Sequence, residues 1–178
     1  MMRNPGLSLV GFGGPGAVSL VDLEVPVPGP GEALLRTLVS PINPADLNVL
    51  EGKYGRLPRL PCVPGTEGVA RVVELGPESE GRLKVGDRVV LPSGHGAWRT
   101  LGVARTGDLV RVPDPLDDHQ AAMVRINPAT AWCLLREVVP SDPGWVLQNA
   151  GSSGVGHAVR SLGRQLGLRV VSFVRDAG

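Results

Sequence analysis

The chain has 178 residues, which is enough for one domain, or for one domain and part of a second. Its net charge of +1 gives no reason to expect nucleic-acid binding, and no apolar run approaches the ~18 residues that a membrane span needs. The two cysteines, Cys62 and Cys133, are far apart, so they imply neither a disulfide framework nor a metal site. Gly and Pro are abundant, but 42% of the residues are hydrophobic. We therefore expect tight turns between short strands, and not disorder.

The first part of the chain is predicted to form short strands separated by turns. The expected strands are residues 7–12, 18–25, 32–39, 69–75, 84–90 (a turn followed by a strand), 97–103 and 108–112. Strands of this length and spacing are typical of a compact β-barrel-like domain. One helix interrupts them and starts within residues 41–47, with Asn43 as its N-cap and Pro44 at its first helical position.

Residues 51–64 form a loop that is too rich in Gly and Pro for regular structure. This loop contains Tyr54, the only tyrosine of the chain. A tyrosine in a loop is ordinarily an amphipathic residue that is half packed against its neighbours. The loop by itself therefore favours a structural role for Tyr54 over a catalytic one.

The pattern changes near residue 122. A helix is expected at residues 116–124, with Asp117 and Asp118 in its first turn, and a second from Asn127 to about residue 139. We therefore predict two domains, residues 1–122 and residues 123–178.

Residues 144–176 have the pattern of a βαβ unit. An apolar run at residues 145–148 is followed by a Gly- and Ser-rich turn, a helix with one apolar stripe that ends at Gly167, and a second strand at residues 168–174. Such a unit is parallel and right-handed. Its turn places backbone N–H groups and a helix N-terminus where they can bind a pyrophosphate.

The turn of this unit departs from the usual G-x-G-x-x-G motif. Gly151 and Gly156 occupy the first and third positions, and Ser153 occupies the second. The alternative is a tight turn with no ligand, but the flanking strands and helix supply the context that a dinucleotide site requires. Ser152 and Ser153 do not form a G-x-S-x-G motif, which argues against a serine hydrolase.

Seven stretches occur in one order over most of the chain: P-I-N-P-A-D-L-N (41–48), G-K-Y-G-R-L-P (52–58), G-T-E-G-V-A (65–70), G-A-W-R-T (96–100), I-N-P-A-T-A-W (126–132), Q-N-A-G-S-S-G-V-G (148–156) and V-R-D (174–176). With these stretches the chain resembles the medium-chain dehydrogenase/reductase superfamily and, within it, the mitochondrial-type trans-2-enoyl-thioester reductases. The resemblance implies an α+β fold, in which a GroES-like β-barrel catalytic domain precedes the first βαβ unit of an incomplete Rossmann domain.

The resemblance also implies the site residues. Tyr54 corresponds to the catalytic tyrosine of these reductases. NADPH is the implied cofactor, and the matching positions are Asn127, Ser152, Ser153, Gly154, Val155, Arg175, Asp176 and Ala177. For Asn127 two interpretations stay open, because it can cap the helix that follows it or contact the cofactor.

No metal site is predicted. The zinc-dependent alcohol dehydrogenases of the superfamily carry Cys and His ligands in loops where this chain has Asn43 and Thr66. A tetrahedral zinc site needs about four N or S ligands, or three and a water. The three histidines, His95, His119 and His157, stand apart from both cysteines.

The implied function is NADPH-dependent reduction of enoyl-CoA or enoyl-ACP in fatty acid synthesis, by an enzyme of which these residues are the N-terminal part. The hydride adds to the β-carbon of an enoyl thioester, and an O–H donor such as a phenol stabilises the enolate and can supply the α-proton. The alternatives are an NADPH quinone reductase of the same superfamily, and a non-catalytic remnant that binds a partner.

NADPH is expected in preference to NADH. An acidic residue that binds the ribose 2′-hydroxyl of NAD stands about 20 positions past the glycines. Arg175 falls at this place, with Asp176 next to it. A guanidinium suits a 2′-phosphate, whereas an inward Asp176 would favour NAD.

Family members are longer and are implied to form homodimers. The sequence ends after the second strand of the βαβ unit, so we expect the 178-residue chain alone to be inactive and marginally soluble. No signal or transit segment is seen at its start, which predicts a cytoplasmic location.

Overall fold

The structure is a computed structural model that describes residues 3–79, 81, 83–138 and 144–175. The chain divides into two compact units, Met1–Ala122 and Met123–Gly178, which are described separately below. None of the described helices is long and apolar enough to cross a membrane.

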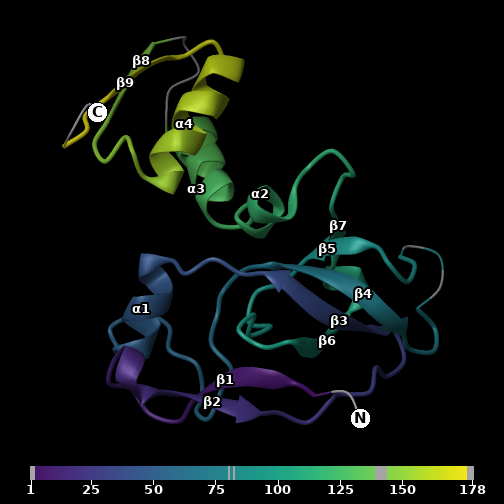
Figure 1. Cartoon of the computed structure of the whole chain (residues 1–178). Helices are drawn as coiled ribbons and strands as arrows, with labels where there is room; N and C mark the ends of the chain where they lie inside the picture. Colours follow the sequence, from purple (N-terminus) through teal and green to yellow (C-terminus); the bar gives the residue numbers. More distant parts are fainter. Residues whose placement is uncertain (1–2, 80, 82, 139–143, 176–178) are drawn as a thin grey trace. The chain divides into compact units, whose positions relative to one another are not determined.

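The first unit is built from a two-stranded hairpin and a five-stranded antiparallel sheet (Figure 1). Its strands are β1 (Pro5–Leu9), β2 (Val18–Asp22), β3 (Glu32–Val39), β4 (Val69–Leu75), β5 (Arg88–Val90), β6 (Leu101–Arg105) and β7 (Val110–Arg111). Its helices are α1 (Pro44–Leu50), α2 (Asp118–Ala122) and the short 3-10 turns η1 (Pro15–Ala17) and η2 (Thr106–Asp108). The hairpin pairs β1 with β2, and the sheet has the order β6-β3-β4-β5-β7.

Apolar residues from β3, β4 and β5 form one buried cluster on a face of the five-stranded sheet. Ala33 and Leu35 on β3 point to the same face as Ala70 and Val72 on β4, and all four are at most 1% exposed. Val89 from β5 joins the same cluster. The sequence predicted the bounds of β3 and β4 residue for residue, because each is an apolar-rich run between Gly or Pro residues.

Asn4 links the hairpin to the sheet. Its side chain is buried, accepts a hydrogen bond from the Leu101 N–H at 2.7 Å and donates one to the Glu24 carbonyl at 2.8 Å. The Asn4 N–H donates to the Asp22 carboxylate at 3.0 Å. One side chain thus joins the starts of β1 and β6 to the chain that follows β2.

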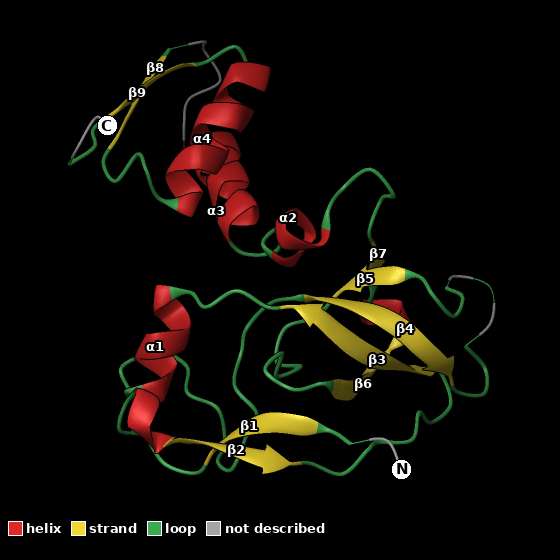
Figure 2. Cartoon of the chain, viewed as in Figure 1, coloured by secondary structure: helices red, strands yellow, loops and turns green. Residues whose placement is uncertain are grey.

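The second unit contains the predicted parallel βαβ arrangement (Figure 2). Its elements are α3 (Asn127–Cys133), the π-helical turn η3 (Leu134–Val138), β8 (Trp145–Gln148), α4 (Gly154–Gln165) and β9 (Arg169–Ser172). The apolar stripe of α4 packs with Ala131 and Leu135 and with residues of the two strands. Gly163 allows the close approach of α4 to β9, because a Cβ there would lie 2.7 Å from a methyl group of Val170.

Several elements differ in extent from their prediction. The first ladder residue of β6 is Leu101 and not residue 97, because the N–H groups of Ala97 and Trp98 bond to the carbonyls of Gly65 and Pro64, outside the sheet. The α2 helix is limited to Asp118–Ala122. The fold class predicted from the sequence, a GroES-like domain followed by the start of a Rossmann-type unit, is confirmed.

Replacing Asn4 by Ala is expected to lower the free energy of unfolding of the first unit by about 2 kcal/mol, because the buried Leu101 N–H loses its acceptor. Urea unfolding followed by circular dichroism measures the change. Asn48→Ala on the exposed side of α1 is the matched control and is expected to have little effect. Equal midpoints for the two variants would contradict the role given to Asn4.

Candidate functional site

The turn between β8 and α4 depends on glycine at two backbone approaches. A Cβ on Gly156 would lie 2.6 Å from the Gly151 carbonyl oxygen and 2.8 Å from that of Ala150. A Cβ on Gly151 would lie 2.6 Å from the Cβ of Ser172 on β9. These distances are shorter than real Cβ contacts allow, so a side chain at either position would force the neighbouring backbone or strand to shift.

Ser153, at the second position of the motif, is the N-cap of α4. Its φ of −74° and ψ of 163° are extended, so no glycine is needed, and its Oγ accepts a hydrogen bond from the Gly156 N–H at 3.1 Å. The N–H groups of Gly154 and Val155 have no acceptor within the described residues. Two free N–H groups at the start of a helix of twelve residues make this a place that fits a phosphate group.

Asn127 lies against this turn. A Cβ on Gly154 would lie 2.7 Å from the Asn127 Nδ2 atom, so the Asn127 amide occupies the space that a larger residue at 154 would fill. The interpretation of Asn127 as a helix cap is wrong: the N-cap of α3 is Ile126, and no side-chain cap bond is made. The Asn-Pro pair indicated the helix start correctly within one residue, but the Asn side chain turns to the glycine-rich turn.

Two residues that the sequence analysis did not single out hold the turn. The Gln148 Nε2 atom donates to the Gly156 carbonyl at 3.1 Å and to the Ser172 Oγ at 2.7 Å, which ties β8 to α4 and β9. The Arg160 guanidinium donates to the Gly151 carbonyl and lies 2.7 Å from the His157 Nδ1 atom. In the sequence, the only sign of a role for Gln148 was that a polar residue ends an apolar strand. No feature of the sequence indicated a role for Arg160.

An open hollow of about 380 Å³ lies beside the turn within the second unit. Apolar side chains form most of its wall, among them Leu135, Val146 and Val159. Gln148 and Ser153 add polar groups at the edge nearest the turn. The hollow thus combines an apolar wall with the turn that carries the free N–H groups.

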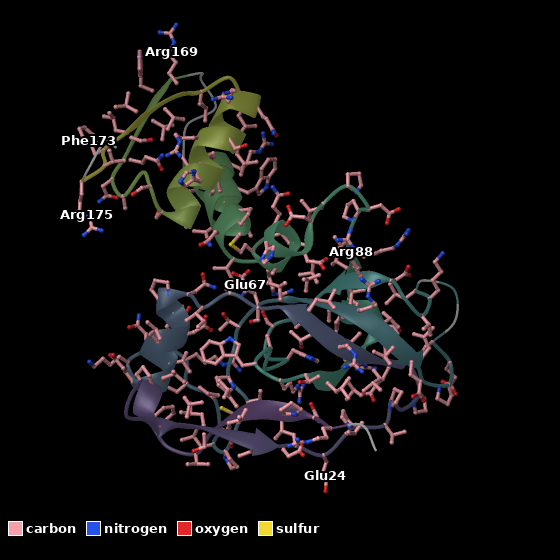
Figure 3. The ribbon with its side chains drawn as sticks, in the orientation of Figure 1. Glu24, Glu67, Arg88, Arg169, Phe173 and Arg175 are labelled. Atoms are coloured by element: carbon pink, nitrogen blue, oxygen red, sulfur yellow. The ribbon has the colours of Figure 1, made fainter. Side chains whose placement is uncertain are left out.

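Arg175 lies where the chain leaves β9, close to Phe173, and is exposed (Figure 3). Its guanidinium forms no ion pair or hydrogen bond within the part of the chain that the structure describes. The predicted neighbours Asp176 and Ala177 lie outside the described residues. Ser152, like Arg175, is exposed, and lies in the turn itself.

Tyr54 belongs to the first unit and follows the end of α1. Its side chain is 47% exposed, and its hydroxyl has no hydrogen-bond partner among the described residues. The hydroxyl is therefore available to a ligand. Leu57, in the same loop, is 38% exposed and adds an apolar side chain nearby in the sequence.

Asn43 and Thr66, at which the sequence analysis predicted no zinc ligands, belong to a hydrogen-bond network. The buried Asp46 carboxylate accepts from the Asn43 N–H at 2.7 Å and from both the N–H and the hydroxyl of Thr66, at 3.1 and 2.9 Å. The Asn43 amide donates to the buried Glu67 carboxylate at 2.9 Å; Figure 3 labels Glu67. Among the described residues, no group of three His, Cys, Asp or Glu could hold a metal ion.

His95 is the histidine most affected by its surroundings. Burial is the main cause that lowers the pKa of His95, to about 4, and the positive charge of Arg99 is the second cause. Burial also lowers the pKa of Arg99. His95 is therefore neutral at neutral pH, and the Arg99 guanidinium donates to its backbone carbonyl at 2.6 Å.

Comparison with known proteins confirms the expected resemblance. Residues 29–114 match the alcohol dehydrogenase GroES-like domain family. The human mitochondrial enoyl-[acyl-carrier-protein] reductase is 42% identical over 161 residues, which cover 89% of this chain and 43% of that protein. A Caenorhabditis elegans protein of the same name is 38% identical over 179 residues, with 98% and 51% covered. The chain thus spans about half the length of these relatives.

Solved structures give the same result. The Etr1p complex with NADP and crotonyl-CoA has a TM-score of 0.87 and 28% identity, and covers 99% of this chain and 55% of that one. The mitochondrial 2-enoyl thioester reductase Etr1p/Etr2p heterodimer from Candida tropicalis also has a TM-score of 0.87 and 28% identity, with 99% of this chain and 55% of that one covered. A putative NADPH:quinone reductase from Bacillus thuringiensis has a TM-score of 0.84 and 30% identity, with 97% and 52% covered.

The cytoplasmic location expected from the sequence is wrong. The human and Caenorhabditis elegans relatives are both named as mitochondrial proteins, which points to mitochondria instead. The expectation rested on the first residues of the chain alone.

Replacing Gly151 by Ala is expected to lower the free energy of unfolding of the second unit by about 2 kcal/mol, because the new Cβ would overlap the Cβ of Ser172. Denaturant unfolding followed by tryptophan fluorescence measures the change, since Trp132 and Trp145 lie in this unit. Gly107→Ala, where no atom lies within 4 Å of the added Cβ, is the control. Unchanged stability of the Gly151 variant would show that the turn relaxes freely.

Proposed function

Because the chain belongs to the medium-chain dehydrogenase/reductase superfamily and matches the N-terminal half of its enoyl-thioester reductases, we propose that the whole protein reduces trans-2-enoyl thioesters with NADPH. The observation that carries the proposal is the identity of about 40% to enoyl-[acyl-carrier-protein] reductases over 89% of the chain. This match includes both the Tyr54 loop and the glycine-rich turn. The substrates proposed are enoyl-CoA or enoyl-ACP, in fatty acid synthesis.

The second unit supplies the proposed cofactor site. The free N–H groups of Gly154 and Val155 would hold the pyrophosphate at the start of α4, next to Ser152 and the Ser153 cap. The Asn127 amide, packed against Gly154, would contact the cofactor from α3. When bound, NADPH supplies the hydride that the β-carbon of the substrate receives. The NADP that is present in the Etr1p complex supports this choice of cofactor.

Tyr54 is the proposed catalytic residue. Its exposed hydroxyl, which has no partner among the described residues, can donate a hydrogen bond to the thioester oxygen as negative charge develops there. The same hydroxyl can deliver a proton to the α-carbon. The reaction is proposed to need no zinc, because Asp46 and Glu67 engage Asn43 and Thr66 in the loops where relatives bind the metal.

The proposed assembly of the whole protein is a homodimer, and the Etr1p/Etr2p heterodimer supports dimerisation within the family. The two domains proposed are residues 1–122 as the GroES-like catalytic domain and residues 123–178 as the start of the NADP-binding domain.

A quinone reductase is the second candidate, because the structure of a putative NADPH:quinone reductase is 30% identical to this chain. Oxidation of NADPH in the presence of crotonyl-CoA or of a quinone separates the two. Turnover of crotonyl-CoA supports the thioester reductase, and turnover of the quinone alone would replace it. A whole protein that binds NADPH but reduces neither would indicate a non-catalytic descendant.

Replacing Tyr54 by Phe in the whole protein is expected to lower kcat by ~10²-fold or more, because a donor used in the transition state is lost. The dissociation constant for NADPH is expected to change little, since no cofactor contact is removed. Stopped-flow or steady-state NADPH oxidation with crotonyl-CoA measures kcat, and fluorescence titration measures NADPH binding. Unchanged turnover would remove Tyr54 from the mechanism.

Replacing Arg175 by Ala is expected to remove most of the preference for NADPH over NADH, because the guanidinium no longer binds the 2′-phosphate. The ratio of kcat/KM for the two cofactors measures this preference. Arg169→Ala is the matched control, since Arg169 is an exposed arginine on β9 that stacks on Trp145. A wild type that prefers NADH, or an Arg175 variant that keeps its NADPH preference, would overturn the assignment.

A further inference from the structure

The end of α1 fixes the backbone from which Tyr54 projects. Gly52 has a φ of +74°, its N–H donates to the Val49 carbonyl at 3.0 Å, and the Lys53 N–H donates to the Asn48 carbonyl at 2.9 Å. These two bonds and the left-handed glycine are the Schellman arrangement that ends a helix. Tyr54 is the next residue after this closed turn.

The Leu50 carbonyl would accept from the Tyr54 N–H if α1 continued. In this structure it accepts from two other donors, the N–H groups of Gly13 and Gly14, at 2.9 and 3.0 Å. These two glycines, which lie 37 and 36 positions before Leu50 in the sequence, thus satisfy the end of the helix. They also keep the Tyr54 backbone out of it.

The Phe12 side chain covers the same turn. A Cβ on Gly52 would lie 3.0 Å from the Phe12 Cβ and 3.1 Å from its Cγ, so the aromatic side chain rests on the glycine. Phe12 is 41% exposed and therefore contributes less to the interior of the unit than a core aromatic does. The Tyr54 hydroxyl itself has no partner among the described residues, so its position depends on this backbone anchor.

We propose that residues 12–14 are a positioning element for Tyr54. Phe12 and the two glycine N–H groups hold the end of α1 in the one conformation that presents the Tyr54 ring. The catalytic consequence rests on the function proposed above, whereas the structural part does not. A misplaced donor costs catalysis without a comparable loss of cofactor binding.

Fluorine NMR of protein labelled with 3-fluorotyrosine tests the structural part without any activity assay. The Tyr54 signal is assigned as the one that is lost in Tyr54→Phe. Phe12→Ala is expected to shift this signal or split it, because the turn is no longer covered. Phe12→Leu, which keeps an apolar cover, is expected to stay close to the wild type. Phe173→Ala, which removes the other phenylalanine of the chain in the second unit, is the control.

In the activity assay, Phe12→Ala is expected to lower kcat about tenfold with an unchanged KM for NADPH, and Phe12→Leu to restore most of it. Thermal melting shows that each variant is folded; if Phe12→Ala is not, Phe12→Val takes its place. A Tyr54 signal that is unaffected in folded Phe12→Ala protein would overturn the proposal. If the signal changes but Tyr54→Phe is fully active, the catalytic role proposed for Tyr54 fails and the positioning stands. If the signal changes but the wild type does not reduce crotonyl-CoA, the proposed function fails and the positioning still stands.

Discussion

The candidate cofactor site depends on one contact between backbones, that of Gly156 with the carbonyls of Ala150 and Gly151. Because no side chain separates them, α4 starts directly above the end of β8. This closeness lets Gln148 reach the first turn of α4 and lets Arg160 reach back to the Gly151 carbonyl. The free N–H groups at the start of the helix are a product of the same contact, since Ser153 can cap only one of them.

Both candidate sites lie at ends of helices, where the backbone groups of a helix lack internal partners. At the start of α4 the unused groups are donors, and they suit an anionic ligand. At the end of α1 the unused groups are acceptors, and the protein satisfies them internally through Gly13, Gly14 and the Gly52 turn. One end is left open for a ligand, and the other is closed so that the residue after it is held in place.

The sequence predicted those parts of the fold that depend on local pattern. The strands Glu32–Val39 and Val69–Leu75 were predicted with their bounds, because each is an apolar-rich run between Gly or Pro residues. The start of β6 was misplaced, since residues before Leu101 bond to distant loops that no local pattern reveals. For Asn127 the sequence left two interpretations open, a helix cap and a cofactor contact. Its amide packs on Gly154, a residue that only the folded chain brings near.

The sequence predicted which residues form the candidate sites, but it did not predict the residues that hold them in position. Gly151, Gly156 and Ser153 were found through the motif and its context, and Tyr54 through a resemblance to a family. Gln148, Arg160 and Phe12 act through partners that lie 8 to 40 positions away, which a reading of adjacent residues does not detect.

Ser153 shows what the second position of the glycine motif requires in this protein. Its backbone dihedral angles are available to every L-amino acid, and its hydroxyl replaces one of the bonds that a helix start lacks. A pattern search that requires glycine at this position therefore excludes chains whose turn adopts the same backbone conformation with a serine. The two outer positions, where a Cβ would collide with backbone or with the neighbouring strand, are the ones that such a search should weight.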